Sequence, residues 1–199
     1  MNEEYLIENP CINIKRLKPP QKLPLFFSRI ELEQLLKAMQ NEEFKALVIV
    51  AVNTGLREME LLSLQWNQIY LEKGILILDN RNHITKGKKI RTLPLNNKVI
   101  DTLLELKIAD NQENLVFQFA GITNRPKFVQ NNIRKYIKLA ELNKKLNFHS
   151  LRHTFASWLV QKGVSIYEVS KLLGHADIKT TQIYAHLRSD DLRDAVELL

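Results

Sequence analysis

Apolar residues recur at helical spacing along most of this 199-residue chain, and the period changes only once, between Gly74 and Leu95. In that interval a short aliphatic run, a turn-like stretch and a second run around Ile90 predict two or three short antiparallel strands. The sequence therefore predicts a mainly α fold with a small antiparallel β-sheet.

Helix boundaries are marked by capping residues and glycines. Ser28 with Glu31, and Ser165 with Glu168, have the spacing of a capping box, and Gly55 and Gly174 stand where helices commonly end. The predicted helices cover about residues 28–39, 42–53, 57–66, 97–107, 127–140, 149–162, 165–173, 178–186 and 190–198. Ile30 and Met59 are expected on buried helix faces, and Trp66 and Phe155 in the core.

Four prolines divide the chain into two parts. Residues 1–24 contain Pro10, Pro19, Pro20 and Pro24, which favour an extended arm or an interdomain linker. Residues 25–199 are long enough, and at 45% hydrophobic residues for the chain apolar enough, to form one packed domain.

The chain is basic, with a net charge of +7. Charge alone leaves nucleic-acid binding open, but residues 80–97 and 124–138 each carry several lysines and arginines and no acid, which favours a polyanion-facing surface over two solvated faces. The longest apolar run is too short to cross a bilayer, so no membrane is expected. A single cysteine, Cys11, rules out an intramolecular disulfide framework and suits a reducing, cytoplasmic setting.

Arg57 and Lys86 are the first candidate functional residues. Arg57 follows a glycine break and is expected in a helix's first turn, where it could bind a phosphate or simply pair with Glu60. Lys86 lies on the predicted hairpin, where it could enter a DNA groove or protonate a leaving oxygen. A solvated turn is the ordinary alternative.

A second group of candidates lies on two later helices. His149 and Arg152 share a helix face and could offer a proton acceptor and a fixed cation to one phosphate. His149 and His153 also have the spacing of a zinc-binding helix, but no glutamate follows His149, and Arg152 would repel a metal ion. Tyr184, taken alone, would be a core or partner-facing residue.

Together these places resemble the tyrosine recombinase, or phage integrase, family. Residues 54–61 (TGLREMEL) are similar to its first motif, residues 149–156 (HSLRHTFA) match its His-x-Leu-Arg-His motif, and residues 172–175 (LLGH) with Tyr184 resemble the last. Lys86 matches the family's hairpin lysine. Each motif alone is a weak signal, but all of them in order across residues 28–199 are specific.

The resemblance implies a tyrosine-recombinase catalytic domain over residues 25–199. Such a site-specific recombinase, or integrase, cleaves and rejoins DNA through a 3′-phosphotyrosine, with no metal, ATP or other cofactor. Arg57 and Arg152 would hold the phosphate oxygens, with a hydrogen bond from His175. Tyr184 would attack, His149 would accept its proton and Lys86 would protonate the leaving oxygen. Glu60 would support Arg57.

The implied partners are double-stranded DNA and further copies of the chain. Residues 190–199 would dock on a neighbouring protomer in a tetramer on DNA, in a bacterial or mobile-element setting. Family members usually carry a core-binding domain ahead of the catalytic one, so the chain is expected to be a fragment or a short member. Three alternatives are a catalytically silent DNA-binding regulator of recombination, a type IB topoisomerase and a metal-dependent nuclease.

Overall fold

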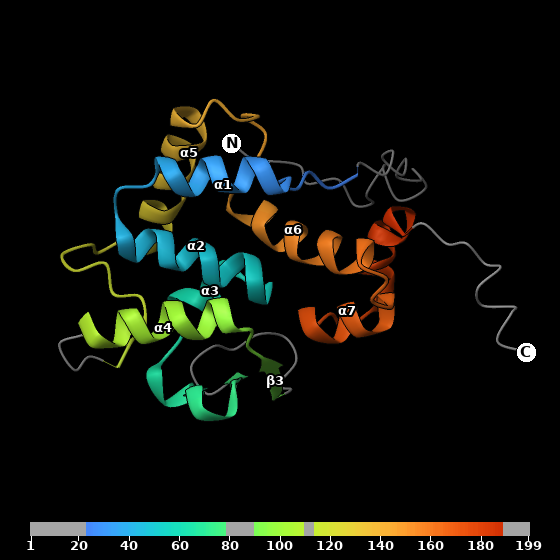
Figure 1. Cartoon of the computed structure of the whole chain (residues 1–199), viewed down its shortest axis with the longest axis horizontal. Helices are drawn as coiled ribbons and strands as arrows, with labels where there is room; N and C mark the ends of the chain where they lie inside the picture. The colour runs from blue at the N-terminus through green and yellow to red at the C-terminus, as the bar shows by residue number, and fades with distance from the viewer. Residues whose placement is uncertain (1–22, 79–89, 110–113, 189–199) are drawn as a thin grey trace, which may run out of the picture.

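A computed structural model of the chain describes residues 23–78, 90–109 and 114–188 (Figure 1). The elements in order are α1 (Arg29–Ala38), α2 (Glu42–Thr54), α3 (Glu58–Leu62), η1 (Trp66–Gln68), β1 (Ile69–Tyr70), η2 (Leu71–Lys73), β2 (Ile75–Leu78), β3 (Arg91–Pro94), α4 (Asn97–Ala109), α5 (Arg125–Leu139), α6 (Phe148–Gln161), α7 (Ile166–Leu173), η3 (Ile178–Thr180) and η4 (Gln182–Leu187).

Helix α2 is the centre of the main core. Most of its side chains are buried, and it packs against α4 on one side and α6 on the other (Figure 1). A helix apolar on nearly all sides has to be surrounded in this way, because no face of it is suited to water. Helix α5 closes the core by contacting α1, α3 and α6.

The predicted sheet is present and has three strands. They pair antiparallel in the order β1-β2-β3, with Leu76 opposite Leu93 and both side chains buried. Arg91, the first residue of β3, pairs with Leu78, the last residue of β2. Arg91 therefore lies at the edge of the sheet from which the chain leaves toward residues 79–89, and Lys86 lies outside the described residues.

The predicted helix ends are mostly confirmed. Both capping boxes form, with Ser28 and Ser165 each accepting a backbone hydrogen bond from the glutamate three residues on. Gly55 and Gly174 end α2 and α7 with left-handed φ angles of 65° each. These ends matter because Gly55 precedes Arg57 and Gly174 precedes His175.

Three expectations about helix 57–66 are wrong. Helix α3 ends at Leu62, because the backbone N–H of Trp66 donates to Asn114 and Gln65 forms a β-bridge with Leu115. Arg57 is consequently the N-cap residue, not part of the first turn. Met59 is 49% exposed. Trp66, at the start of η1, is partly buried and packs against the main core, as expected.

Ile30 is also exposed, contrary to expectation. Its side chain is 69% accessible because, at the helical spacing, it points away from the buried stripe that Leu32 and Leu35 form on α1. The core instead begins just before α1, where Phe27 is fully buried and its backbone N–H donates to Thr154 Oγ1 of α6 at 2.9 Å.

A second, smaller apolar cluster lies at the end of the described chain. Helices α6 and α7 and the η4 segment enclose Ala156, Val160, Val169, Leu173 and Tyr184. The predicted helix over 178–186 is two 3₁₀ segments instead, η3 and η4. The predicted helix over 190–198 lies outside the described residues. Among those described, none of the helices has the length and apolar character to cross a membrane.

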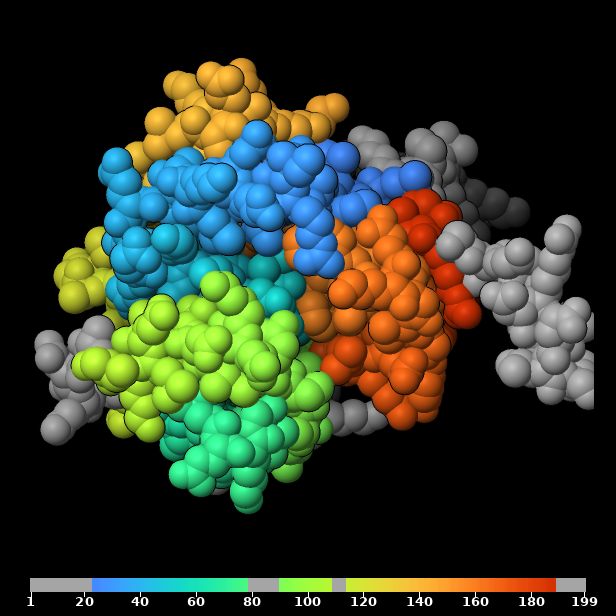
Figure 2. Space-filling view, in the orientation of Figure 1, coloured from blue at the N-terminus to red at the C-terminus, as the bar shows by residue number. Residues whose placement is uncertain are grey.

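Figure 2 shows the outer surface of this arrangement. Helix α1, helices α6 and α7, and helix α4 meet on the face that it presents.

Candidate active site

The site begins at the α2–α3 junction, where Arg57 and Glu60 form a compact unit. Glu60 accepts a hydrogen bond from the Arg57 backbone N–H at 2.8 Å and pairs with the Arg57 guanidinium at 2.9 Å. The anticipated Arg57–Glu60 ion pair is thus present. It does not occupy the whole guanidinium, because the Arg57 side chain is 42% exposed.

Arg152, from α6, is the buried cation of the site. The residue is 4% exposed, and its guanidinium donates to the carbonyls of Gly55 at 2.5 Å and Leu173 at 2.8 Å. Both carbonyls lie at helix C-termini, where the helix dipole favours a cation. Burial, followed by the charge of Arg57, lowers the pKa of Arg152 to about 9, so the guanidinium remains protonated at neutral pH.

A third guanidinium, that of Arg91, enters the site from the sheet edge. It donates to Glu60 Oε2 at 3.1 Å and to the Leu173 carbonyl. Sequence reasoning placed Arg91 only within a basic stretch. The one signal for a site role was its place on the predicted hairpin close to Lys86.

His175 is oriented by a buried threonine. Its Nδ1 lies 2.8 Å from the Thr181 hydroxyl, and Thr181 is fully buried. If the hydroxyl donates to Nδ1, the neutral ring carries its proton on Nε2 and keeps that N–H as a donor. Burial, then the charges of Arg152, Arg57 and Arg91, lower the pKa of His175 to about 4. Thr181 was not predicted from the sequence.

Tyr184 is held by a histidine that was not assigned a role from the sequence. The Tyr184 hydroxyl lies 2.6 Å from His153 Nδ1, whereas His149 contacts the His153 ring edge to face at 4.7 Å between centroids. Burial, then the nearby His149 and Arg152, lower the pKa of His153 to about 4. At neutral pH His153 is therefore uncharged and can accept a hydrogen bond from the phenol.

The Tyr184 residue is 2% exposed and belongs to the smaller apolar cluster. Burial raises the pKa of its hydroxyl to about 12, although the charge of Arg152 opposes this shift. Tyr184 is therefore a buried core residue, as one reading of the sequence expected, and it also lies close to the candidate site. A buried phenol with such a pKa is protonated at neutral pH and reacts only if a base takes its proton.

The structure brings five of the six sequence-predicted catalytic residues into one neighbourhood. Arg152 interacts electrostatically with Arg57 and Tyr184, and His175 with Arg152 and His149. Burial, then Arg152 and Arg57, likewise lower the pKa of His149. The sixth residue, Lys86, is outside the described ranges.

The zinc alternative for His149 and His153 gains no third ligand among the described residues. Within residues 23–78, 90–109 and 114–188, no group of three or more histidines, cysteines and carboxylates is placed to hold a metal ion.

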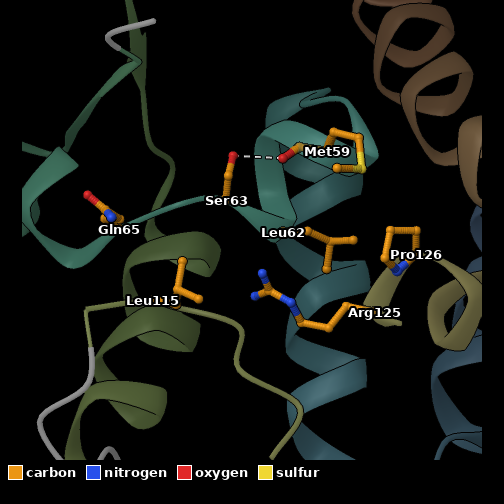
Figure 3. Close-up of a pocket in the computed structure, with 7 residues that line it drawn as sticks. All are labelled: Met59, Leu62, Ser63, Gln65, Leu115, Arg125 and Pro126. Carbon is orange, nitrogen blue, oxygen red and sulfur yellow. Dashed lines mark hydrogen bonds between the residues drawn. The ribbon is translucent and has the colours of Figure 1, made fainter. Parts of the chain in front are cut away.

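A pocket of about 220 Å³ lies outside this site, beside α3 and the start of α5 (Figure 3). It is lined by Met59, Leu62, Ser63, Gln65, Leu115, Arg125 and Pro126. None of the five predicted catalytic residues that the structure describes lines it.

Comparison with solved structures identifies the class of fold. The crystal structure of XerA recombinase superposes with a TM-score of 0.71 at 29% identity, over 94% of this chain and 68% of that one. The catalytic domain of bacteriophage HP1 integrase gives a TM-score of 0.69 at 27% identity, over 87% of this chain and 94% of that domain. The fold is that of a tyrosine-recombinase catalytic domain.

Sequence comparison gives the family. The sequence profile of the Phage integrase family matches residues 26–190. A tyrosine recombinase of Thermosipho africanus is 32% identical over 98% of this chain and 68% of its own length, and the tyrosine recombinase XerA of Pyrococcus horikoshii is 30% identical over 96% and 67%. The chain therefore belongs to the phage integrase family of tyrosine-type site-specific recombinases. It spans about two thirds of the length of these two relatives.

Proposed function

We propose that this domain breaks and rejoins duplex DNA through a covalent 3′-phosphotyrosine at Tyr184. The Tyr184 oxygen forms a bond to phosphorus as the bond from phosphorus to the 5′ oxygen breaks. An imidazole takes the phenol proton, and the Lys86 ammonium supplies a proton to the departing 5′ oxygen. The energy of the phosphodiester is retained in the protein–DNA bond, so a 5′-hydroxyl can reverse the step without ATP or a metal.

The observation that carries the proposal is the convergence of Arg57, Arg152, His175 and Tyr184 from separate elements of the fold. Phosphoryl transfer gathers negative charge on the non-bridging oxygens, and fixed donors aimed at that charge lower the barrier. Arg57 keeps an exposed guanidinium for one such oxygen. Arg152 adds a buried positive charge, and His175 a hydrogen bond, with Glu60 supporting Arg57.

Two imidazoles compete for the role of proton acceptor. The pKa of His149, the acceptor assigned from the sequence, is lowered by burial and then by the charges of Arg152 and Arg57. His153 has the direct contact with the phenol. We keep His149 as a proposed catalytic residue and add His153 as the group that holds the phenol before attack.

The proposed substrate is double-stranded DNA. Helix α5 exposes Lys127, Arg134, Lys135 and Lys138, and we propose that these side chains neutralise backbone phosphates. Among the solved structures with this fold, XerH recombinase was crystallised on its difH substrate in a post-cleavage complex, with 27% identity and a TM-score of 0.69 over 89% of this chain and 54% of that one. A tetramer on DNA, in the cytoplasm of a bacterium, remains part of the proposal.

The test is covalent trapping. The full chain is incubated with a library of nicked duplexes of random sequence, in which the fragment beyond the cleaved phosphate diffuses away and religation fails. We expect an adduct that survives detergent, forms in the presence of EDTA and carries its nucleotide on the Tyr184 peptide by mass spectrometry.

The matched variant is Tyr184→Phe, which lacks only the hydroxyl. It is expected to shift DNA in gels as the wild type does and to form no adduct. DNA binding without an adduct by the wild type would favour the silent regulator instead, and an adduct in Tyr184→Phe would remove Tyr184 from its role.

A further inference from the structure

Arg91 has contacts that its position on a strand does not require. Its guanidinium, with a side chain 14% exposed, spans from the sheet edge to Glu60 of α3 and to the last carbonyl of α7. A long side chain loses considerable rotamer freedom when it is fixed in this way, so the bonds at both ends have to offset that cost. Three separate elements, β3, α3 and α7, thus meet at one guanidinium.

Glu60 is the first group that depends on Arg91. Burial raises the pKa of this carboxyl, but Arg91, followed by the hydrogen bond from Arg57, outweighs burial and holds the pKa below its ordinary range. Glu60 is therefore ionised, and it contacts both Arg57 and Arg91. Without Arg91, the negative charge of Glu60 would be offset only by Arg57 and Arg152, the two arginines proposed to hold the phosphate.

The Leu173 carbonyl is the second shared group. It accepts hydrogen bonds from both Arg91 and Arg152, and the following Gly174 leaves the space that this requires. A Cβ atom on Gly174 would lie 2.1 Å from Arg91 Nη1 and could not coexist with the present position of the guanidinium. The glycine before His175 therefore has a steric role as well as a conformational one.

The charges of these four side chains match the proposed reaction. Arg57, Arg91 and Arg152 carry three positive charges and Glu60 one negative charge, so their sum is +2. A phosphodiester attacked by a phenolate carries two negative charges, one from each group. Removing Arg91 would leave a sum of +1 against the same transition state.

We propose that Arg91 is a positioning residue for strand cleavage. It offsets the charge of Glu60 and shares the Leu173 carbonyl with Arg152. The positive charges of Arg57 and Arg152 then act on the scissile phosphate without being reduced by Glu60. This inference rests on the proposed function, because it assigns Arg91 a part in that same site.

Two substitutions separate charge from hydrogen bonding. Arg91→Gln removes the charge and keeps a donor, whereas Arg91→Lys keeps the charge and loses the planar fork. Single-turnover adduct formation is measured on the duplex recovered from the trapping library. We expect Arg91→Gln to cleave about tenfold more slowly, the size of one unit charge acting over roughly 10 Å at an effective dielectric constant near 20. Arg91→Lys is expected to recover most of that loss.

The double variant Arg91→Gln/Glu60→Gln restores the sum of +2 and is expected to cleave faster than Arg91→Gln alone. Lys107→Met, which removes an exposed charge on α4, is the control and is expected to match the wild type. DNA affinity and the unfolding midpoint are measured for all variants, since a purely structural role would change the midpoint and would not favour lysine over glutamine. Equal rates for Arg91→Gln and the wild type, or further loss in the double variant, would overturn the proposal.

A DNA-free measurement keeps this inference separate from the proposed function. Arg91 is one of the charges that lower the pKa of His175, so NMR titration of that ring reads the local field directly. We expect the His175 pKa to rise in Arg91→Gln and to stay unchanged in Lys107→Met. If the His175 pKa is unchanged in Arg91→Gln, the role of Arg91 is contradicted even when the wild type cleaves DNA. If the wild type forms no adduct, the proposed function is refuted whatever the titration shows.

Discussion

At the scale of single residues, the proposed reaction depends on which group takes the proton from the Tyr184 hydroxyl. Its pKa is about 12, far above neutral pH, so the proposed attack requires a base that takes the phenol proton. His153 is neutral, already lies 2.6 Å from the hydroxyl and can accept the proton at Nδ1. His149 is the acceptor that the family motif suggests, so the two rings have to be separated by experiment.

Glutamine substitution separates them. In His153→Gln the amide oxygen can still accept a hydrogen bond from the phenol but cannot take up its proton. If His153 is the acceptor, this variant is expected to form the adduct on the order of 100-fold more slowly, with His149→Gln much less affected. Rate constants from single-turnover trapping give the ranking, and the reverse order would return the role to His149.

The residues of the site differ in how well their roles could be predicted from the sequence. His149 and Arg152 could be paired because helical spacing fixes a shared face. His153 lies in the same motif, yet its partner Tyr184 is 31 positions away, and nothing local indicates which ring meets the phenol. Arg91 was less visible still, because its contacts with Glu60 and Leu173 depend on how the sheet packs against α3 and α7.

At the scale of elements, two glycines that follow helices, Gly163 and Gly174, can be compared directly. Gly163 follows α6 with φ of 85° and has nothing within 4 Å of a built Cβ, whereas Gly174 follows α7 with φ of 65° and faces Arg91. Both backbones are left-handed, so alanine is strained at either position.

We therefore expect Gly163→Ala and Gly174→Ala to lose a similar amount of folding stability but to differ in cleavage rate. Each loses about 1–2 kcal/mol of stability from the left-handed backbone. Only Gly174→Ala displaces the Arg91 guanidinium, so only that variant is expected to lose cleavage rate beyond its change in stability. Urea unfolding and adduct formation, measured in parallel, check this, and equal cleavage by the two variants would argue against the steric role.

Elements whose ends are set by local chemistry were predicted well. The capping boxes at Ser28 and Ser165 and the glycine ends of α2 and α7 are encoded within a few residues of each boundary. Helix α3 was predicted too long because its end depends on backbone bonds to residues 114 and 115, which are remote in sequence. The 3₁₀ form of residues 178–187 was not visible either, since its apolar pattern also fits an α-helix.

At the scale of the whole molecule, the histidines couple stability to pH. The pKa values of His153 and His175 are about 4 in the folded chain, against an ordinary 6.5 in the unfolded one. Below about pH 6.5 the unfolded chain therefore binds protons that the folded chain does not, and stability falls as the pH drops toward 4.

We expect the thermal midpoint in low-salt buffer to decrease steadily between pH 6.5 and pH 4.5. The double variant His153→Asn/His175→Asn is expected to flatten that decrease, and His186→Asn, at an exposed position, is the matched control. Differential scanning calorimetry at several pH values makes the comparison, and a steep decrease in the double variant would contradict this origin of the pH dependence.

The enclosure of Tyr184 by a 3₁₀ segment has an energetic consequence. Hydrogen bonds in such a segment are less well aligned than those of an α-helix, and η4 spans only residues 182–187. Arg152 is hydrogen-bonded to the C-terminal ends of the longer helices α2 and α7, whereas Tyr184, the proposed nucleophile, lies on the short η4 segment. If the chain binds duplex DNA as proposed, we expect Tyr184 to leave its apolar enclosure by a rearrangement of η4 that keeps the hydrogen bonds of Arg152 to α2 and α7.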